Sequence, residues 1–178
     1  MKKVQKWTLL GLGILILFGG VLFVTAKKPP KSNVAVAPNV GYRVPSFTFT
    51  TYPDNRPISV SPNMNKPLFI NFWASWCPPC QAEAPDLEKA YEKYGKQVEF
   101  IGVNLTSQDT LPDVQKFLNT YGIKYTTALD TTGMAASEYK IVAIPTSIFV
   151  DRSGVIVDRY TGAIPPQYLD SDLQRIEQ

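Results

Sequence analysis

The sequence predicts an α/β domain in which a central sheet is flanked by helices. Short apolar runs typical of buried strands alternate with stretches whose apolar residues recur every three or four positions, the spacing of one helix face. This interleaving favours a sheet covered by helices over an all-helical or all-β domain. Residues 43–178 carry the pattern and suffice for one domain with its own core.

The domain is expected to begin with a β-hairpin. Phe47 and Phe49 alternate with threonines, residues 52–55 (Tyr-Pro-Asp-Asn) have the composition of a turn, and Ile58 and Val60 continue the alternation. This hairpin would form an N-terminal β-hairpin extension of the α/β domain.

Two buried strands and a helix between them should form the centre of the domain. The strands are expected at 68–72 and 98–105, and the intervening helix places Ala84, Leu87 and Tyr91 on one face.

The C-terminal half supplies three further helices and a second hairpin. Helices are expected at 112–121 and 135–139, and an amphipathic helix containing Leu169 and Leu173 closes the chain. A hairpin should join 148–150 to 155–157 through the turn 151–154.

The N-terminus has the pattern of a membrane anchor. Residues 1–6 are basic and are expected in the cytoplasm, and residues 7–26 are uncharged, about 20 residues or roughly 30 Å of helix, which matches a bilayer core. A cleaved signal peptide ending at Ala26 is the alternative. Its apolar region would exceed the usual length, and Lys27 and Lys28 would immediately follow the cut.

Residues 27–42 are rich in proline, lysine and small residues and predict a flexible tether to the domain 43–178. A long domain after an N-terminal anchor is expected on the extracytoplasmic side, as a single-pass protein of the cell membrane. The compartment suits disulfide chemistry.

Charge and composition exclude several functions. The chain has a formal charge of +3, but six of its 18 basic residues precede Ser32 and none of its 15 acidic residues do, so the remainder has a net charge of −3. Nucleic-acid binding therefore has no electrostatic support. The absence of histidine excludes hydrolysis by a Ser-His or Cys-His pair within this chain.

Both cysteines lie in the run Cys77-Pro78-Pro79-Cys80. A disulfide that closes so short a loop stabilises the folded chain only weakly, by about 2 kcal/mol in the chain-entropy model. Two cysteines without histidine are too few ligands for a tetrahedral zinc site, so no metal is expected. The pair is best interpreted as a redox-active dithiol.

The prolines predict which sulfur attacks. Pro78 and Pro79 mark the first turn of a helix and make Cys77 its N-cap, where free N–H groups and the helix dipole favour the thiolate. Cys77 is therefore the expected nucleophile, and Cys80, one turn on and expected to be less exposed, resolves the mixed disulfide. Glu83, on the same helical side, is either an ordinary acid near a helix start or a partly buried proton carrier for the thiols.

The run Phe72-Trp-Ala-Ser-Trp-Cys-Pro-Pro-Cys80 resembles the active-site signature of the thioredoxin superfamily. Together with Asn71, Glu83 and residues 144–154, it is similar in particular to the TlpA/ResA-like membrane-anchored thiol-disulfide oxidoreductases. Asn71 stands where thioredoxin itself has a titrating aspartate, which shifts proton handling toward Glu83. The resemblance implies a thioredoxin-like fold with a central mixed sheet and no bound cofactor.

The resemblance also implies how partners are contacted. Pro145 would be a cis-proline facing the dithiol, so that Ile144 offers its backbone to an extended substrate segment. Trp76, expected to be exposed, and Pro78 would contact the same substrate, whereas Trp73 would support the turn by packing.

The expected activity is reduction of disulfides in exported proteins, apocytochrome c or cell-envelope and spore factors, with electrons from a membrane protein of the CcdA/DsbD type. Three alternatives are a thiol oxidase or isomerase of the same fold, a peroxiredoxin-like peroxidase, and a non-catalytic tethered binding module. The peroxidase is disfavoured because that family's threonine is Ala74 in this chain.

Overall fold

A computed structural model describes residues 34–64 and 66–178. The predicted cytoplasmic segment 1–6, the anchor 7–26 and residues 27–33 of the tether lie outside the described residues. Among the described residues, no helix has the length and apolar character needed to span a bilayer.

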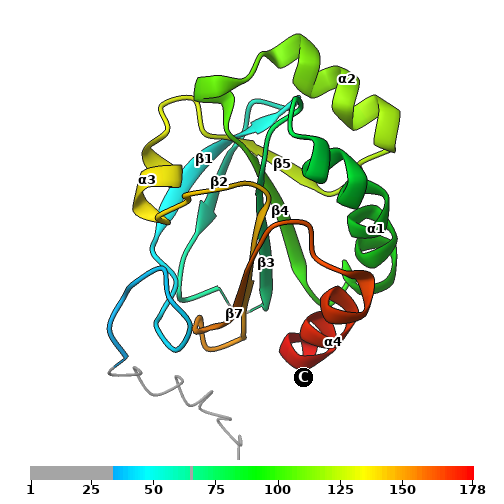
Figure 1. Ribbon diagram of the computed structural model, residues 1–178. Helices are drawn as coiled ribbons and strands as arrows, with labels where there is room; N and C mark the ends of the chain where they lie inside the picture. The colour runs from blue at the N-terminus through cyan, green and yellow to red at the C-terminus, as the bar shows by residue number, and fades with distance from the viewer. Residues whose placement is uncertain (1–33, 65) are drawn as a thin grey trace, which may run out of the picture. The chain divides into compact units, whose positions relative to one another are not determined.

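One seven-stranded mixed sheet forms the centre of the domain (Figure 1), in the order β2-β1-β5-β4-β3-β6-β7. Strands β3, β4 and β5 are parallel, and the other neighbouring pairs are antiparallel. The strands are β1 Phe47–Tyr52, β2 Pro57–Val60, β3 Leu68–Trp73, β4 Glu99–Asn104, β5 Thr126–Leu129, β6 Thr146–Val150 and β7 Ile156–Thr161.

In residues 34–64 and 66–178, four α-helices cover the sheet, with α1, α2 and α4 on one face and α3 on the other (Figure 1). They are α1 Pro78–Tyr94, α2 Leu111–Tyr121, α3 Met134–Glu138 and α4 Pro166–Glu177, and a short 3₁₀ turn, Thr106–Gln108, precedes α2. The architecture confirms the predicted thioredoxin-like α/β fold with its N-terminal hairpin.

The alternation of β3 sets the two sides of the core. Because successive strand residues point to opposite faces, Leu68, Ile70 and Phe72 join the cluster that packs under α3. Phe69 and Trp73 face the helices α1, α2 and α4. Asn71 lies between them in the strand, so its polar side chain is directed toward α1, whose first turn contains Cys80.

Two segments differ from the sequence-based expectation. Strand β5 was not predicted, because its four residues, Thr-Thr-Ala-Leu, have neither an apolar run nor a clear alternation. Residues 35–42 were assigned to the tether, yet Gly41 N–H donates to the Ile156 carbonyl at 2.8 Å and Ile156 N–H donates back to the Tyr42 carbonyl at 2.8 Å. The chain is therefore bonded to the start of β7 before residue 43.

Candidate active site: the Cys77–Cys80 disulfide

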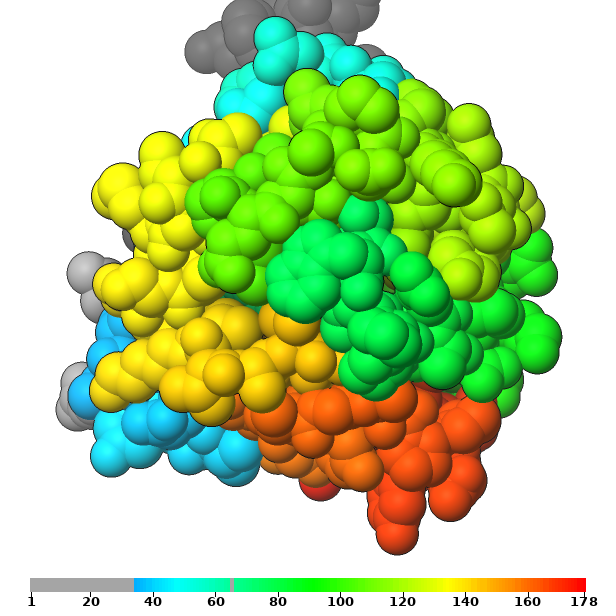
Figure 2. All heavy atoms as spheres, turned by 45° about the horizontal axis from the view of Figure 1, so that its top comes forward, coloured from blue at the N-terminus to red at the C-terminus, as the bar shows by residue number. Residues whose placement is uncertain are grey.

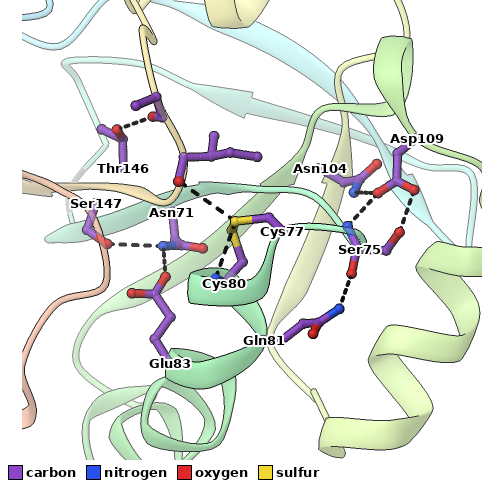
Figure 3. Close-up of a disulfide and its surroundings, with 12 residues drawn as sticks. Asn71, Ser75, Cys77, Cys80, Gln81, Glu83, Asn104, Asp109, Thr146 and Ser147 are labelled. Carbon is purple, nitrogen blue, oxygen red and sulfur yellow. Dashed lines mark hydrogen bonds between the residues drawn. A yellow bond between two sulfur atoms is a disulfide. The ribbon is translucent and has the colours of Figure 1, made fainter.

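Cys77 and Cys80 form a disulfide where β3 ends and α1 begins, with their Cα atoms 5.3 Å apart (Figure 3). Cys77 is the N-cap of α1 in an extended conformation, and Pro78 and Pro79 occupy the first two helical positions, as predicted. The Cys80 N–H donates to Cys77 Sγ at 3.3 Å. The helix start therefore directs an N–H group at the sulfur predicted to be the nucleophile.

Exposure does not distinguish the two cysteine residues. Each cysteine residue is 2% exposed to solvent, so the expectation that Cys80 is less exposed than Cys77 is wrong. The difference between them is their helix position, because only Cys77 sits at the N-cap, where the dipole favours negative charge.

The segment before β6 lies against the disulfide. The Ile144–Pro145 bond is cis, as the resemblance implied, and the Ile144 carbonyl oxygen is 3.7 Å from Cys77 Sγ. The sulfur carries no proton in the disulfide, so this contact can become a hydrogen bond only when Cys77 is a thiol. The space-filling view in Figure 2 shows the start of α1, the region around the start of α2 and the segment before β6 meeting on one face.

Glu83 is a buried carboxyl group, 4% exposed, on the second turn of α1. Its Oε1 accepts from Asn71 Nδ2 at 2.8 Å, and its Oε2 accepts from the Ile164 N–H at 3.1 Å. Burial raises the pKa of Glu83 from 4.5 to about 7, although the bonds from Ile164 and Asn71 oppose the rise. Near neutral pH this group can therefore both take up and release a proton.

The two tryptophans differ as predicted. Trp73 is 3% exposed and stacks on Phe117, with ring centroids 4.3 Å apart. Trp76 is 54% exposed, and its indole N–H donates to the Gln108 carbonyl at 2.9 Å. Pro78 is also exposed beside the disulfide.

Asp109 is a functional candidate that the sequence analysis missed. Its carboxylate accepts from both the N–H and the hydroxyl of Ser75, two residues before Cys77, at 2.7 and 2.6 Å (Figure 3). Burial alone would raise its pKa, but the Ser75 bonds and those from Asn104 and Thr110 outweigh burial and lower it. No sequence motif singles out an aspartate whose partner Ser75 lies more than 30 residues earlier in the chain.

A protein-family model described as Redoxin matches residues 39–176. The chain belongs to the Redoxin family. It is 31% identical over 138 residues to the thiol-disulfide oxidoreductase ResA of Bacillus thuringiensis, a match covering 77% of this chain and 78% of that protein. It is 28% identical to the thioredoxin-like protein YneN of Bacillus subtilis over 95% of this chain and 97% of that protein.

Among solved structures, StoA from Bacillus subtilis is similar, with a TM-score of 0.63 and 28% identity over 72% of this chain and 95% of that one. These findings confirm the resemblance to ResA-like proteins, and this Redoxin family member is a thiol-disulfide oxidoreductase with a Cys77–Cys80 pair. Within the part of the chain that the structure describes, no three Cys, Asp or Glu side chains are grouped to hold a metal ion.

Proposed function

We propose that this oxidoreductase reduces disulfides in exported proteins from the extracytoplasmic face of the cell membrane, where it is held by residues 7–26. The uncharged stretch of bilayer length at the N-terminus supports the anchor. The chemistry supports a location outside the cytoplasm, since disulfides persist there.

The position of Cys77 at the N-cap of α1 is the observation that carries the proposed cycle. The Cys77 thiolate attacks one sulfur of a substrate disulfide, and the other substrate sulfur leaves as a thiolate that takes up a proton. Cys80 then loses its proton and attacks Cys77 Sγ, which releases the second substrate thiol and forms the Cys77–Cys80 disulfide. Two electrons pass from the dithiol to the substrate, and each of the two released substrate sulfurs takes up one proton.

Glu83 is the proposed proton carrier for the second step. It lies one helical turn after Cys80, its carboxyl group is buried, and its pKa of about 7 leaves a substantial deprotonated fraction at neutral pH. A deprotonated Glu83 accepts the proton that Cys80 must lose before it attacks, and a protonated Glu83 returns that proton when the dithiol is restored.

The substrate segment is proposed to lie between Trp76 and Pro78 on one side and Ile144-Pro145 on the other. Ile144 is partly buried, and its carbonyl group is directed at Cys77 Sγ. An extended peptide bonded to the Ile144 backbone would place its own cysteine beside the nucleophile, in the manner of an added strand.

Electrons are proposed to come from a membrane dithiol protein of the CcdA/DsbD type. The proposed substrates are apocytochrome c, whose haem-attachment cysteines must be reduced, or cell-envelope and spore factors. Each of them presents a protein disulfide, which is the bond that the Cys77–Cys80 dithiol would reduce.

Trapping tests the cycle and identifies the substrate. Cys80→Ser removes the resolving sulfur, so the mixed disulfide at Cys77 should accumulate and be recoverable without reductant. Cys77→Ser is the matched control and should trap nothing. A trap that forms equally well in Cys77→Ser would refute the assigned polarity.

The direction of electron flow is tested by the reduction potential of the pair. Thioredoxin-like proteins span about −270 to −120 mV, and a reductase belongs toward the negative end. A measured value above about −150 mV would overturn the reductase assignment in favour of an oxidase.

A further inference from the structure

Ser75 is held by side chains from two other elements. Its N–H and hydroxyl both donate to Asp109, at 2.7 and 2.6 Å, and its carbonyl accepts from Gln81 Nε2 at 2.7 Å. All of its hydrogen-bonding groups are thus engaged outside the Cys-Pro-Pro-Cys motif. Ser75 lies in the turn that leads into Cys77, whose own N–H donates to the Ala74 carbonyl at 3.3 Å.

Only a carboxylate satisfies the donors that converge at this point. Oδ2 of Asp109 accepts from Ser75 N–H and from Asn104 Nδ2 at 2.8 Å, and Oδ1 accepts from the Ser75 hydroxyl and from Thr110 N–H at 2.8 Å. A carboxylate offers about four acceptor sites, all of which are used. An asparagine would direct an NH₂ group at one of these N–H donors.

The same loop also holds Trp76. The indole N–H of Trp76 donates to the carbonyl of Gln108, the residue immediately before Asp109. The turn preceding the nucleophile is therefore bonded to the loop before α2 through Ser75 and through Trp76. This loop and the start of α1 are in contact on the face that carries the disulfide (Figure 2).

We propose that Asp109 is a positioning residue for thiol-disulfide exchange: by fixing Ser75, it holds Cys77 at the helix N-cap and Trp76 beside it. The proposal rests on the assignment of Cys77 as the nucleophile. Asp109 acts through Ser75 and the turn, with no contact to the sulfurs required.

Asp109→Asn and Asp113→Asn form a matched pair for the test in the full chain. Both substitutions remove one negative charge from the same short stretch. Asp113 accepts from the Thr110 hydroxyl at 2.6 Å on the first turn of α2, a contact that asparagine can keep. The difference between the two variants therefore reports geometry rather than charge. Ser75→Ala removes one of the four bonds with no change in charge.

Two rates are measured on the reduced proteins: alkylation of Cys77 by iodoacetamide across pH, and reduction of insulin disulfides. Alkylation follows the thiolate fraction, so at pH 7 it should be about threefold slower in Asp109→Asn than in Asp113→Asn. Insulin reduction should be about tenfold slower, because exchange is sensitive to displacement of the attacking atom. Ser75→Ala should lie between wild type and Asp109→Asn, and it decides the question if Asp109→Asn does not fold.

A purely structural role would lower the melting temperature without moving the pH profile of the folded protein. Equal alkylation and reduction rates in Asp109→Asn and Asp113→Asn, or wild-type rates in Ser75→Ala, would overturn the positioning role alone. Preferential alkylation of Cys80 in the wild-type protein would instead refute the proposed function.

Discussion

Burial of Glu83 should make the oxidised protein less stable as the pH rises. The pKa of this carboxyl group is about 7 in the folded chain, against 4.5 as its ordinary value, with burial as the main cause. Between these two values the folded state binds more protons than the unfolded state, so the free energy of unfolding falls with pH. Each pKa unit is worth about 1.4 kcal/mol, so the loss amounts to about 3 kcal/mol.

Urea unfolding at fixed pH values between 5 and 8 measures this loss. The disulfide is kept intact, so that neither cysteine titrates. Glu83→Gln should remove the decline assigned to this group. At pH 5 it should lower stability by about 1 to 3 kcal/mol, because an amide cannot accept from both Asn71 and Ile164, and this deficit should disappear or reverse by pH 8, where the wild type has lost stability.

Glu138→Gln is the control, since it makes the same chemical change at an exposed position on α3 and should leave the decline intact. A decline of unchanged size in Glu83→Gln, or a wild-type protein whose stability is flat over this range, would show that the buried carboxyl group is not the cause.

Further outcomes follow from the same contacts. Glu83→Gln should slow the resolving step and remove the inflection near pH 7 from its rate profile, as measured by quenched-flow alkylation; an unchanged profile contradicts the proton role. Trp76→Ala should slow reduction of protein disulfides while changing stability by less than about 1 kcal/mol, whereas Trp73→Ala should cost about 3 to 5 kcal/mol in urea unfolding. Gly154→Ala should cost more than about 2 kcal/mol, because φ is +80° and the added Cβ would lie 2.1 Å from a backbone carbonyl oxygen. Gly122→Ala, at φ +66° with open space around it, should lose only about 1 kcal/mol, and equal losses would refute the steric argument.

The sequence predicted most helices and strands because their apolar spacing is local information. Strand β3 was expected at 68–72 and runs Leu68–Trp73, and the second helix was expected at 112–121 and runs Leu111–Tyr121. Strand β5 escaped prediction because its place is set by pairing with β4 and β1 rather than by its own four residues. The bonding of residues 35–42 to β7 depends on a partner more than 100 residues away, which proline-rich composition cannot reveal.

The candidate site likewise has features that local sequence predicts and features that depend on residues distant in the chain. The N-cap position of Cys77 and the exposure of Trp76 follow from residue types at fixed spacing, and the structure confirms both. Glu83 also accepts a hydrogen bond from the Ile164 N–H, and the Ser75 hydroxyl donates to Asp109. Both partners are distant in sequence, so only the folded chain brings them to the site.

The described chain joins the sheet at the end opposite the disulfide (Figure 1). Val44 N–H donates to the Gly154 carbonyl at 2.9 Å, next to the turn between β6 and β7, which lies at the start of β3, whereas Cys77 follows its end. The six residues of β3 separate the two by roughly 17 Å. The N-terminal part of the described chain is therefore bonded to the sheet away from Cys77, so a substrate that approaches the sulfur does not have to displace it.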